Sequence, residues 1–227
     1  MGQEKTKLWY FENFNLMKTL PIKELMKLNS SSKMTTAPKK QIIYFPEENS
    51  NSVYLIKKGK VKISRLSEDG REIIIAILGQ GEIFGESAIT DTGSKREEFA
   101  EATEDTILCN MFSEIIHDLM EKDPSFGFKI TKIIGFRFKR IQARFESLIF
   151  KPSDERVRCF IKDLAKDEGI KIDSGEIELK LNLTHEDIGK LTATSRQTVT
   201  TVLNDLEKRN VISYDRSKIL VKDLSKF

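Results

Sequence analysis

The sequence contains few of the residues on which metal centres and covalent cross-links depend. Of its 227 residues, only two are cysteine and two are histidine. Cys109 and Cys159 lie far apart and among apolar residues, so we expect buried free thiols and no disulfide. His117 and His185 are isolated, and we expect both to be partly exposed helix residues. No metal site and no cofactor are therefore predicted.

Long apolar runs are also missing. No stretch approaches the roughly 20 residues that a bilayer-spanning helix needs. The opening residues MGQEKTKLWYF contain no apolar segment after a basic one, as a secretory signal would. Hydrophobic residues make up 39% of the chain and charged residues 32%, which is typical of a globular protein with a packed core. We therefore expect a cytoplasmic protein with no membrane partner.

Patterns typical of enzymes are absent as well. The sequence shows no paired nucleophile and base, no metal-ligand spacing and no Walker-type phosphate loop. No catalytic residue is therefore assigned, and we expect the protein not to be an enzyme.

Residues 183–212 have the pattern of a helix-turn-helix. Two short segments with helical apolar spacing are separated only by residues 192–194. Thr184 and Ser195 are candidate N-caps of the two helices, and Asp187 completes a shortened capping box with Thr184. In such a motif, the second helix enters the major groove of DNA.

The second helix carries polar side chains opposite its apolar stripe. Arginine and glutamine can contact guanine and adenine edges, and threonine can contact a thymine methyl group. Because the net charge is only +3, the argument for DNA rests on the position of these side chains. A simpler alternative is a pair of packed helices in an all-α domain. The candidate DNA-contacting residues on this helix are Arg196, Gln197, Thr200 and Thr201.

A two-stranded wing is predicted after this helix. Residues 211–214 and 219–221 are rich in β-branched and apolar residues, and they flank a short polar turn. Arg216 and Lys218 in this turn are expected to contact DNA phosphates.

The segment IGKLTATSRQTVTTVLNDLEKRNVI resembles the winged helix-turn-helix of the Crp/Fnr family of bacterial transcription regulators. The family pattern is roughly I-G-x-x-x-G-x-S-R-E-T-V-x-R-x-L-x-x-L-x-x-x-x-x-I. Ala193 replaces the usual turn glycine, Gln197 replaces a common glutamate, and Thr201 replaces a second arginine, so the operator sequence cannot be transferred. The chain keeps Ile188, Gly189, Ser195, Arg196, Thr198, Val199, Leu203, Leu206 and Ile212.

The resemblance extends over most of the chain. Pro21 begins a short helix in an N-terminal preamble, and from Lys40 to Met111 short β-rich segments alternate with turns. The expected fold is α+β, with a jelly-roll-like β-roll sensor domain, a long dimerisation helix and a winged helix-turn-helix. The expected domains are residues 1–120, 121–151 and 152–227. The Fnr branch holds an iron–sulfur cluster on N-terminal cysteines, which this chain lacks.

A long helix is predicted from Pro124 to Phe150. One apolar stripe, formed by Phe126, Ile130 and Ile133, is expected to pack on the β-roll. A second stripe has heptad spacing, which is typical of a helix–helix seam. A single core helix would also fit, but the resemblance implies a homodimer on a palindromic operator. The predicted seam consists of Ile134, Phe138, Ile141, Phe145 and Leu148.

Residues 81–88 resemble the start of the family's phosphate-binding cassette. In cyclic-nucleotide-binding members, the glutamate after the last glycine bonds the ribose, and an arginine ten residues later pairs with the phosphate. Gly85, Glu86 and Arg96 occupy these positions. The resemblance therefore implies an effector pocket at this place in the β-roll.

The rest of the cassette departs from that pattern. Glu97 and Glu98 follow the arginine and would oppose a phosphate by charge. The adenine-contacting hydroxyls of the long helix correspond to Ile141 and Gln142. Arg137 is expected near the pocket, so an anionic ligand is one alternative. Cyclic AMP, another small effector and no effector are all left open.

These patterns together predict a sequence-specific DNA-binding transcription regulator. Double-stranded DNA and a second copy of the chain are the expected partners, and activation would also need contact with RNA polymerase. A cyclic-nucleotide-responsive regulator, or a sensor that works through protein contacts without DNA, is the alternative.

Overall fold

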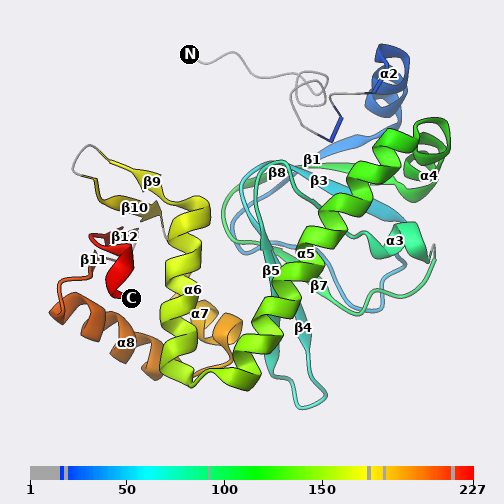
Figure 1. Ribbon diagram of the computed structural model, residues 1–227. Helices are drawn as coiled ribbons and strands as arrows, with labels where there is room; N and C mark the ends of the chain where they lie inside the picture. The colour runs from blue at the N-terminus through cyan, green and yellow to red at the C-terminus, as the bar shows by residue number, and fades with distance from the viewer. Residues whose placement is uncertain (1–15, 18–19, 92, 173–174, 181–182, 216–217) are drawn as a thin grey trace. The chain divides into compact units, whose positions relative to one another are not determined.

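The computed structural model describes residues 16–17, 20–91, 93–172, 175–180, 183–215 and 218–227. The chain divides into two compact units (Figure 1). The first contains residues 1–71 and 75–139, and the second contains residues 72–74 and 140–227. No described helix is long and apolar enough to cross a bilayer.

Two four-stranded sheets form most of the first unit. Their strand orders are β1-β8-β3-β6 and β2-β7-β4-β5. The strands are β1 (Lys33–Ala37), β2 (Ile42–Tyr44), β3 (Ser52–Lys58), β4 (Val61–Leu66), β5 (Glu72–Leu78), β6 (Ile83–Phe84), β7 (Phe99–Ala102) and β8 (Thr106–Phe112). Isoleucine, valine and aromatic residues are frequent in these strands, as β structure favours. One cluster of buried residues draws on both sheets and includes Tyr44, Ile56, Val61, Leu78, Phe84 and Leu108.

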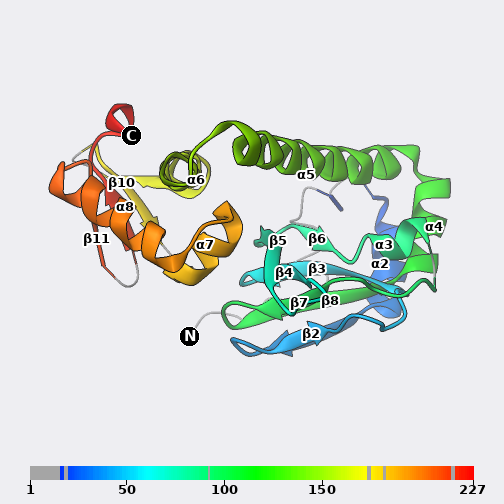
Figure 2. The same ribbon diagram turned by 90° about the horizontal axis from the view of Figure 1, so that it is seen from below.

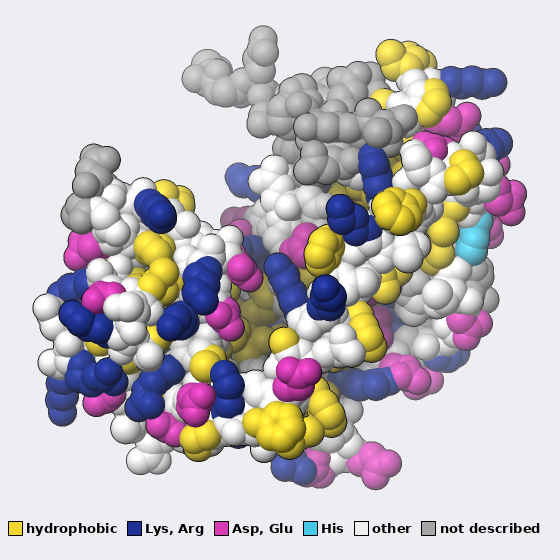
Figure 3. Space-filling view, in the orientation of Figure 1, with side chains coloured by type: hydrophobic (Ala, Val, Ile, Leu, Met, Phe, Trp, Pro, Cys, Tyr) yellow, Lys and Arg dark blue, Asp and Glu magenta, His cyan; other side chains and the backbone are white. Residues whose placement is uncertain are grey.

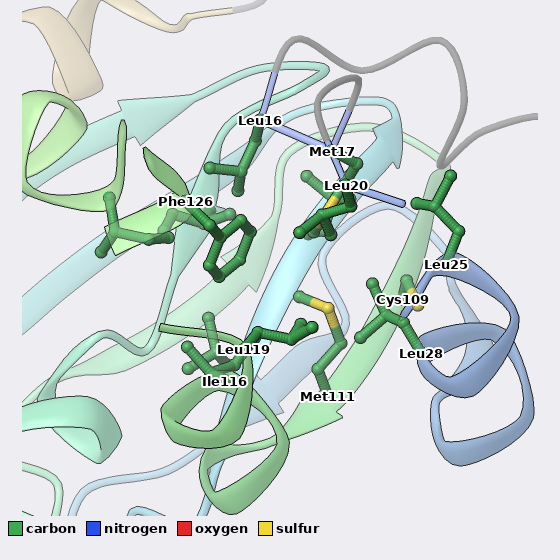
Figure 4. Packing of buried hydrophobic residues seen from close by; sticks show 14 of the residues in the cluster. Leu16, Met17, Leu20, Leu25, Leu28, Cys109, Met111, Ile116, Leu119 and Phe126 are labelled. Carbon is green, nitrogen blue, oxygen red and sulfur yellow. The ribbon is translucent and has the colours of Figure 1, made fainter. Parts of the chain in front are cut away.

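Helices pack a second apolar cluster against the sheets. They are α2 (Ile22–Ser31), α3 (Ser87–Thr90), α4 (Ser113–Lys122) and α5 (Pro124–Phe150). Figure 4 shows side chains from α2, α4, β8 and the start of α5 pointing into this cluster. Phe126 is fully buried and Ile130 is 2% exposed, which confirms the predicted packing stripe. In Figure 2 the first part of α5 lies over the strands accordingly.

The second unit is a three-helix core with a small sheet. Its elements are α6 (Ser153–Glu168), β9 (Ile170–Lys171), β10 (Ile177–Lys180), α7 (His185–Thr192), α8 (Arg196–Lys208), β11 (Ile212–Tyr214), β12 (Lys218–Val221) and the 3-10 turn η1 (Leu224–Lys226). The sheet order is β11-β12-β10-β9, with antiparallel pairing. The apolar stripes of α6, α7 and α8 meet in one buried cluster with the strands.

The predicted fold class is confirmed, and the long helix has the predicted bounds. The N-terminal preamble differs from expectation, because Leu16, Met17 and Leu20 are buried and residues 33–37 pair as a strand with β8. The sequence KMTTA has no clear alternation of apolar and polar residues, and it becomes a strand through its neighbour.

The two cysteines also differ from each other. Cys109 is buried as expected, but Cys159 is only half-buried. The Lys151 ammonium lies 2.9 Å from the Cys159 sulfur, a contact that apolar flanking residues did not indicate.

Candidate DNA interface and sensor pocket

The predicted capping box is present at the start of α7. The Thr184 hydroxyl accepts a hydrogen bond from the Asp187 backbone N–H at 3.1 Å, and the Asp187 carboxylate accepts one from the Thr184 N–H at 2.9 Å. Both contacts satisfy N–H groups that the first turn of a helix leaves unpaired. Aspartate therefore serves here in place of the usual glutamate.

The turn between α7 and α8 is tight. Ala193 caps α7 in the left-handed region, with φ of 50° and ψ of 49°, where glycine is usual and an alanine costs about 1 kcal/mol. A Cβ on Gly189 would lie 2.8 Å from the Thr194 carbonyl oxygen, so a side chain there would push the turn away. These two positions hold the two helices at a fixed separation.

Helix α8 presents one apolar and one polar face. Ser195 caps it by accepting the Thr198 N–H at 3.0 Å. The buried face consists of Val199, Val202, Leu203 and Leu206. Arg196, Gln197 and Thr201 are exposed on the other side. The Arg196 guanidinium makes no hydrogen bond or ion pair with the other described residues, so it is free to contact a ligand.

Thr200 differs from these three residues because it is half-buried and already engaged. Its hydroxyl lies 3.0 Å from the Arg196 carbonyl oxygen and 2.9 Å from Nδ1 of His185. From the sequence, His185 is predicted only to be an isolated, partly exposed helix residue. No local sequence pattern indicates that it lies next to the second helix.

The wing is formed by β11 and β12, as predicted. Lys218 is exposed, with its ammonium 3.5 Å from the Glu178 carboxylate. The Tyr214 hydroxyl donates to the Asn204 side-chain oxygen at 2.7 Å, which ties β11 to α8. Arg216, the other predicted wing contact, lies outside the described residues.

Many of the side chains on the face of this unit seen in Figure 3 are lysine or arginine. Figure 3 shows these side chains gathered around α6 and α8. A shallow hollow of about 280 Å³ opens beside the start of α8. The hollow is lined by Asp154, Ser195, Gln197, Thr198, Thr201 and Val202. The Asp154 carboxylate there is paired with Arg158 at 2.9 Å, which offsets its charge.

In the first unit, the predicted sensor residues Glu86 and Arg137 contact each other. Their ion pair is largely buried, with the Arg137 side chain 14% exposed and that of Glu86 30% exposed. Arg137 also donates to the Ile83 carbonyl oxygen at 2.6 Å. The carboxylate expected to bind a ribose is therefore neutralised by the chain itself.

Arg96 is buried against two aromatic rings, those of Tyr44 and Tyr54. It is 2% exposed, donates to the Ser52 carbonyl oxygen at 2.8 Å, and its guanidinium carbon lies 4.0 Å from the Tyr44 ring centroid. Its Nη1 atom is buried without a hydrogen-bond partner among the described residues. Gly85 has a φ of 77°, and a Cβ there would lie 3.1 Å from this nitrogen. An anion could therefore pair with Arg96 only within the confined, buried space around this nitrogen.

The two glutamates after Arg96 do not act as a pair. Glu97 is 71% exposed and forms an ion pair with Arg65. Glu98 accepts a hydrogen bond from the Tyr44 hydroxyl at 3.3 Å, and burial raises the pKa of that tyrosine well above its usual range.

The remaining predicted positions lie along α5. Ile141 and Gln142 are exposed residues of the second unit, whereas Glu86, Arg96 and Arg137 belong to the first. The predicted seam residues are all at least partly exposed, from 36% at Ile134 to 62% at Phe145. An apolar stripe along a helix is costly to leave in water.

Comparisons with known proteins agree with this architecture. Residues 34–123 match the model of a cyclic nucleotide-binding domain, and residues 155–227 match that of a Crp-like helix-turn-helix domain. A global nitrogen regulator from Synechococcus elongatus is 30% identical over 79% of this chain and 81% of that protein. A CRP-like cAMP-activated global transcriptional regulator from Mycobacterium tuberculosis is 28% identical over 82% of each.

Solved structures show the same fold. A CooA mutant from Carboxydothermus hydrogenoformans is 31% identical, with a TM-score of 0.74 over 87% of this chain and 86% of that one. FixK2 from Bradyrhizobium japonicum is 20% identical, with a TM-score of 0.75 over 86% of this chain and 94% of that one, and supports the fold alone.

Proposed function

Because this chain belongs to the Crp/Fnr family of bacterial transcription regulators, we propose that it acts as a homodimer on a two-fold symmetric operator. The chain is a DNA-binding transcription regulator, as its relatives and its helix-turn-helix indicate. The observation that carries the proposal is the outer face of α8, where Arg196, Gln197 and Thr201 are exposed on a helix whose other face is buried.

Each DNA-facing residue has a proposed role. Arg196 and Gln197 read base edges, since their side chains can make paired hydrogen bonds to guanine and adenine. Thr201 adds a base or phosphate contact. Thr184, Ser195, Thr200 and the wing residues Arg216 and Lys218 position the protein on the DNA backbone. These contacts take place in the cytoplasm, with RNA polymerase as a further partner where the protein activates.

The dimer follows from the apolar stripe of α5. Two copies that pair along this stripe bury it and carry two α8 helices, one for each half of the operator. Half-sites one turn of DNA apart are the geometric expectation.

Selection of bound genomic fragments tests this function directly. Purified protein is expected to enrich fragments that share an inverted repeat with half-site centres about 10 base pairs apart. Sequencing of the bound pool would show the motif. Failure to enrich any common sequence would instead support a sensor that works through protein contacts.

For the sensor domain, we propose a small effector other than cyclic AMP. Arg137 already holds Glu86, and Glu98 lies next to the Tyr44 ring over which Arg96 stacks, so a ribose phosphate would have to displace an internal ion pair and approach a carboxylate. Both effects oppose its binding.

Cyclic AMP is accordingly expected to leave the operator affinity unchanged. Fluorescence anisotropy with a labelled operator fragment, measured with and without the nucleotide, checks this. The variant Arg137→Gln serves as the control. It frees Glu86 from its ion pair with Arg137 and so removes the internal competitor for the nucleotide. An increase in wild-type affinity of about tenfold or more would identify a cyclic-nucleotide-responsive regulator.

A further inference from the structure

His185 is the first residue of α7, and it connects three parts of the DNA-binding unit. Its Nδ1 atom lies 2.9 Å from the Thr200 hydroxyl on α8. Its ring centroid lies 6.0 Å from that of Tyr214 on β11, with the planes tilted by 49°. One half-buried imidazole therefore contacts both the recognition helix and the wing.

The contact with Thr200 fits a ring in which Nδ1 is the donor. The Thr200 hydroxyl has one proton, and it donates that proton to the Arg196 carbonyl oxygen at 3.0 Å. In this arrangement its oxygen accepts from His185, and the neutral ring carries its hydrogen on Nδ1. Nε2 makes no hydrogen bond to the other described residues, and it can gain or lose a proton without breaking the contact with Thr200.

We propose that His185 is a positioning residue of the DNA interface, which fixes the Thr200 hydroxyl through Nδ1 while Nε2 takes up a proton when operator DNA binds. The inference rests on the proposed DNA-facing role of α8. Phosphates brought close to the ring favour the imidazolium form, because a nearby opposite charge stabilises a charged group. Operator binding and proton uptake at this residue are then linked.

The groups around the ring favour its neutral form in the free protein. Burial and the positive charge of Arg196 on α8 lower the pKa of His185. Tyr214 on β11 is uncharged at neutral pH, since burial raises its pKa. The free protein therefore presents an imidazole that DNA can convert to a cation.

The carboxylates of α7 are occupied by other partners. Glu186 pairs with Lys190 at 2.9 Å. Asp187 accepts hydrogen bonds from Thr184. These contacts leave the phosphates of DNA as the strongest new negative charge that the ring would meet.

The sign of the pH effect follows from this linkage. If DNA raises the pKa of the histidine, affinity increases as the pH falls through the pKa of the bound form and levels off below that of the free form. For the full-length protein we expect operator affinity to be roughly tenfold higher at about pH 5.5 than at about pH 7.5, per half-site.

Two variants and a matched control separate this effect from a structural one. His185→Gln cannot titrate, and His185→Arg is charged throughout, so both should lose the pH-dependent increase. His117→Gln removes the other histidine of the chain, which is exposed on α4, and should keep the wild-type profile. Anisotropy titrations with the selected operator at fixed ionic strength provide the measurement.

The outcomes are distinct. The inference is supported if both His185 variants lose the increase in operator affinity at low pH while His117→Gln keeps the wild-type profile. Wild-type and His185→Gln profiles that superimpose would overturn it, while specific operator binding by both proteins would leave the proposed function intact. If the wild-type protein binds no operator at any pH, the proposed function itself fails.

Discussion

Replacing Phe138 with glutamate is expected to convert the dimer to a monomer and to abolish tight operator binding. Phe138 is 58% exposed on α5 and belongs to the proposed seam. Two-fold symmetry places both copies of the substitution in one interface. Burial of a phenylalanine contributes about 1.5–3 kcal/mol, and an unpaired carboxylate in an apolar seam adds a further penalty. The dimer dissociation constant should therefore rise by roughly 100-fold or more.

Loss of the dimer also removes the second half-site contact. A monomer engages one half-site, without the effective concentration that links the two recognition helices in a dimer. Sedimentation velocity over a range of protein concentrations measures the association state. Gel-shift titration on the same samples measures operator affinity.

Phe136 offers a control of the same residue type on the same helix. It is also 58% exposed, but residues two positions apart lie on different faces of a helix. Phe136→Glu should keep the dimer and the operator affinity. If both variants remain dimeric, or both become monomeric, the seam through Phe138 is wrong.

The features that could be predicted from the sequence are those that depend on neighbouring residues. The caps Thr184 and Ser195 and the apolar face of α8 follow from spacings of three and four residues, which the helix itself determines. The bounds of α5 follow equally from Pro124 and from the break at Pro152.

The features that could not be predicted join distant residues. Arg137 and Glu86 are 51 positions apart, and the sequence alone predicts that each is available for an effector. Their pairing depends on how α5 packs on the β-roll, and no local pattern encodes this. The contact between His185 and Thr200 spans 15 positions across the tight turn at Ala193. No local pattern encodes this contact either, so the sequence does not predict it.

Replacement of Arg196 by alanine is expected to reduce operator affinity and to relax specificity at one base pair of each half-site. A paired arginine–guanine contact contributes about 1–3 kcal/mol of discrimination, so each half-site should lose roughly tenfold to 100-fold in affinity. In a dimer the loss occurs at both half-sites. Because the guanidinium has no hydrogen bond or ion pair with other described residues, its removal should not change the fold.

Arg196→Lys and Lys208→Ala distinguish base reading from a general charge effect. Lysine keeps the charge but lacks the planar fork, so a base contact should be weakened and a phosphate contact largely kept. Lys208 is an exposed residue in the last turn of α8, and its loss removes one charge far from the start of the helix. This control should bind nearly as the wild type does.

Binding to operators substituted at each position, repeated at several salt concentrations, decides between the two roles. If Arg196 reads a base, the alanine variant loses its preference at one position while the salt dependence changes little. If it contacts a phosphate, affinity falls equally for all sequences, and the slope of log affinity against log salt decreases by about one. The second result would leave Gln197 and Thr201 as the base-reading residues of α8, because they are the other exposed side chains near its start.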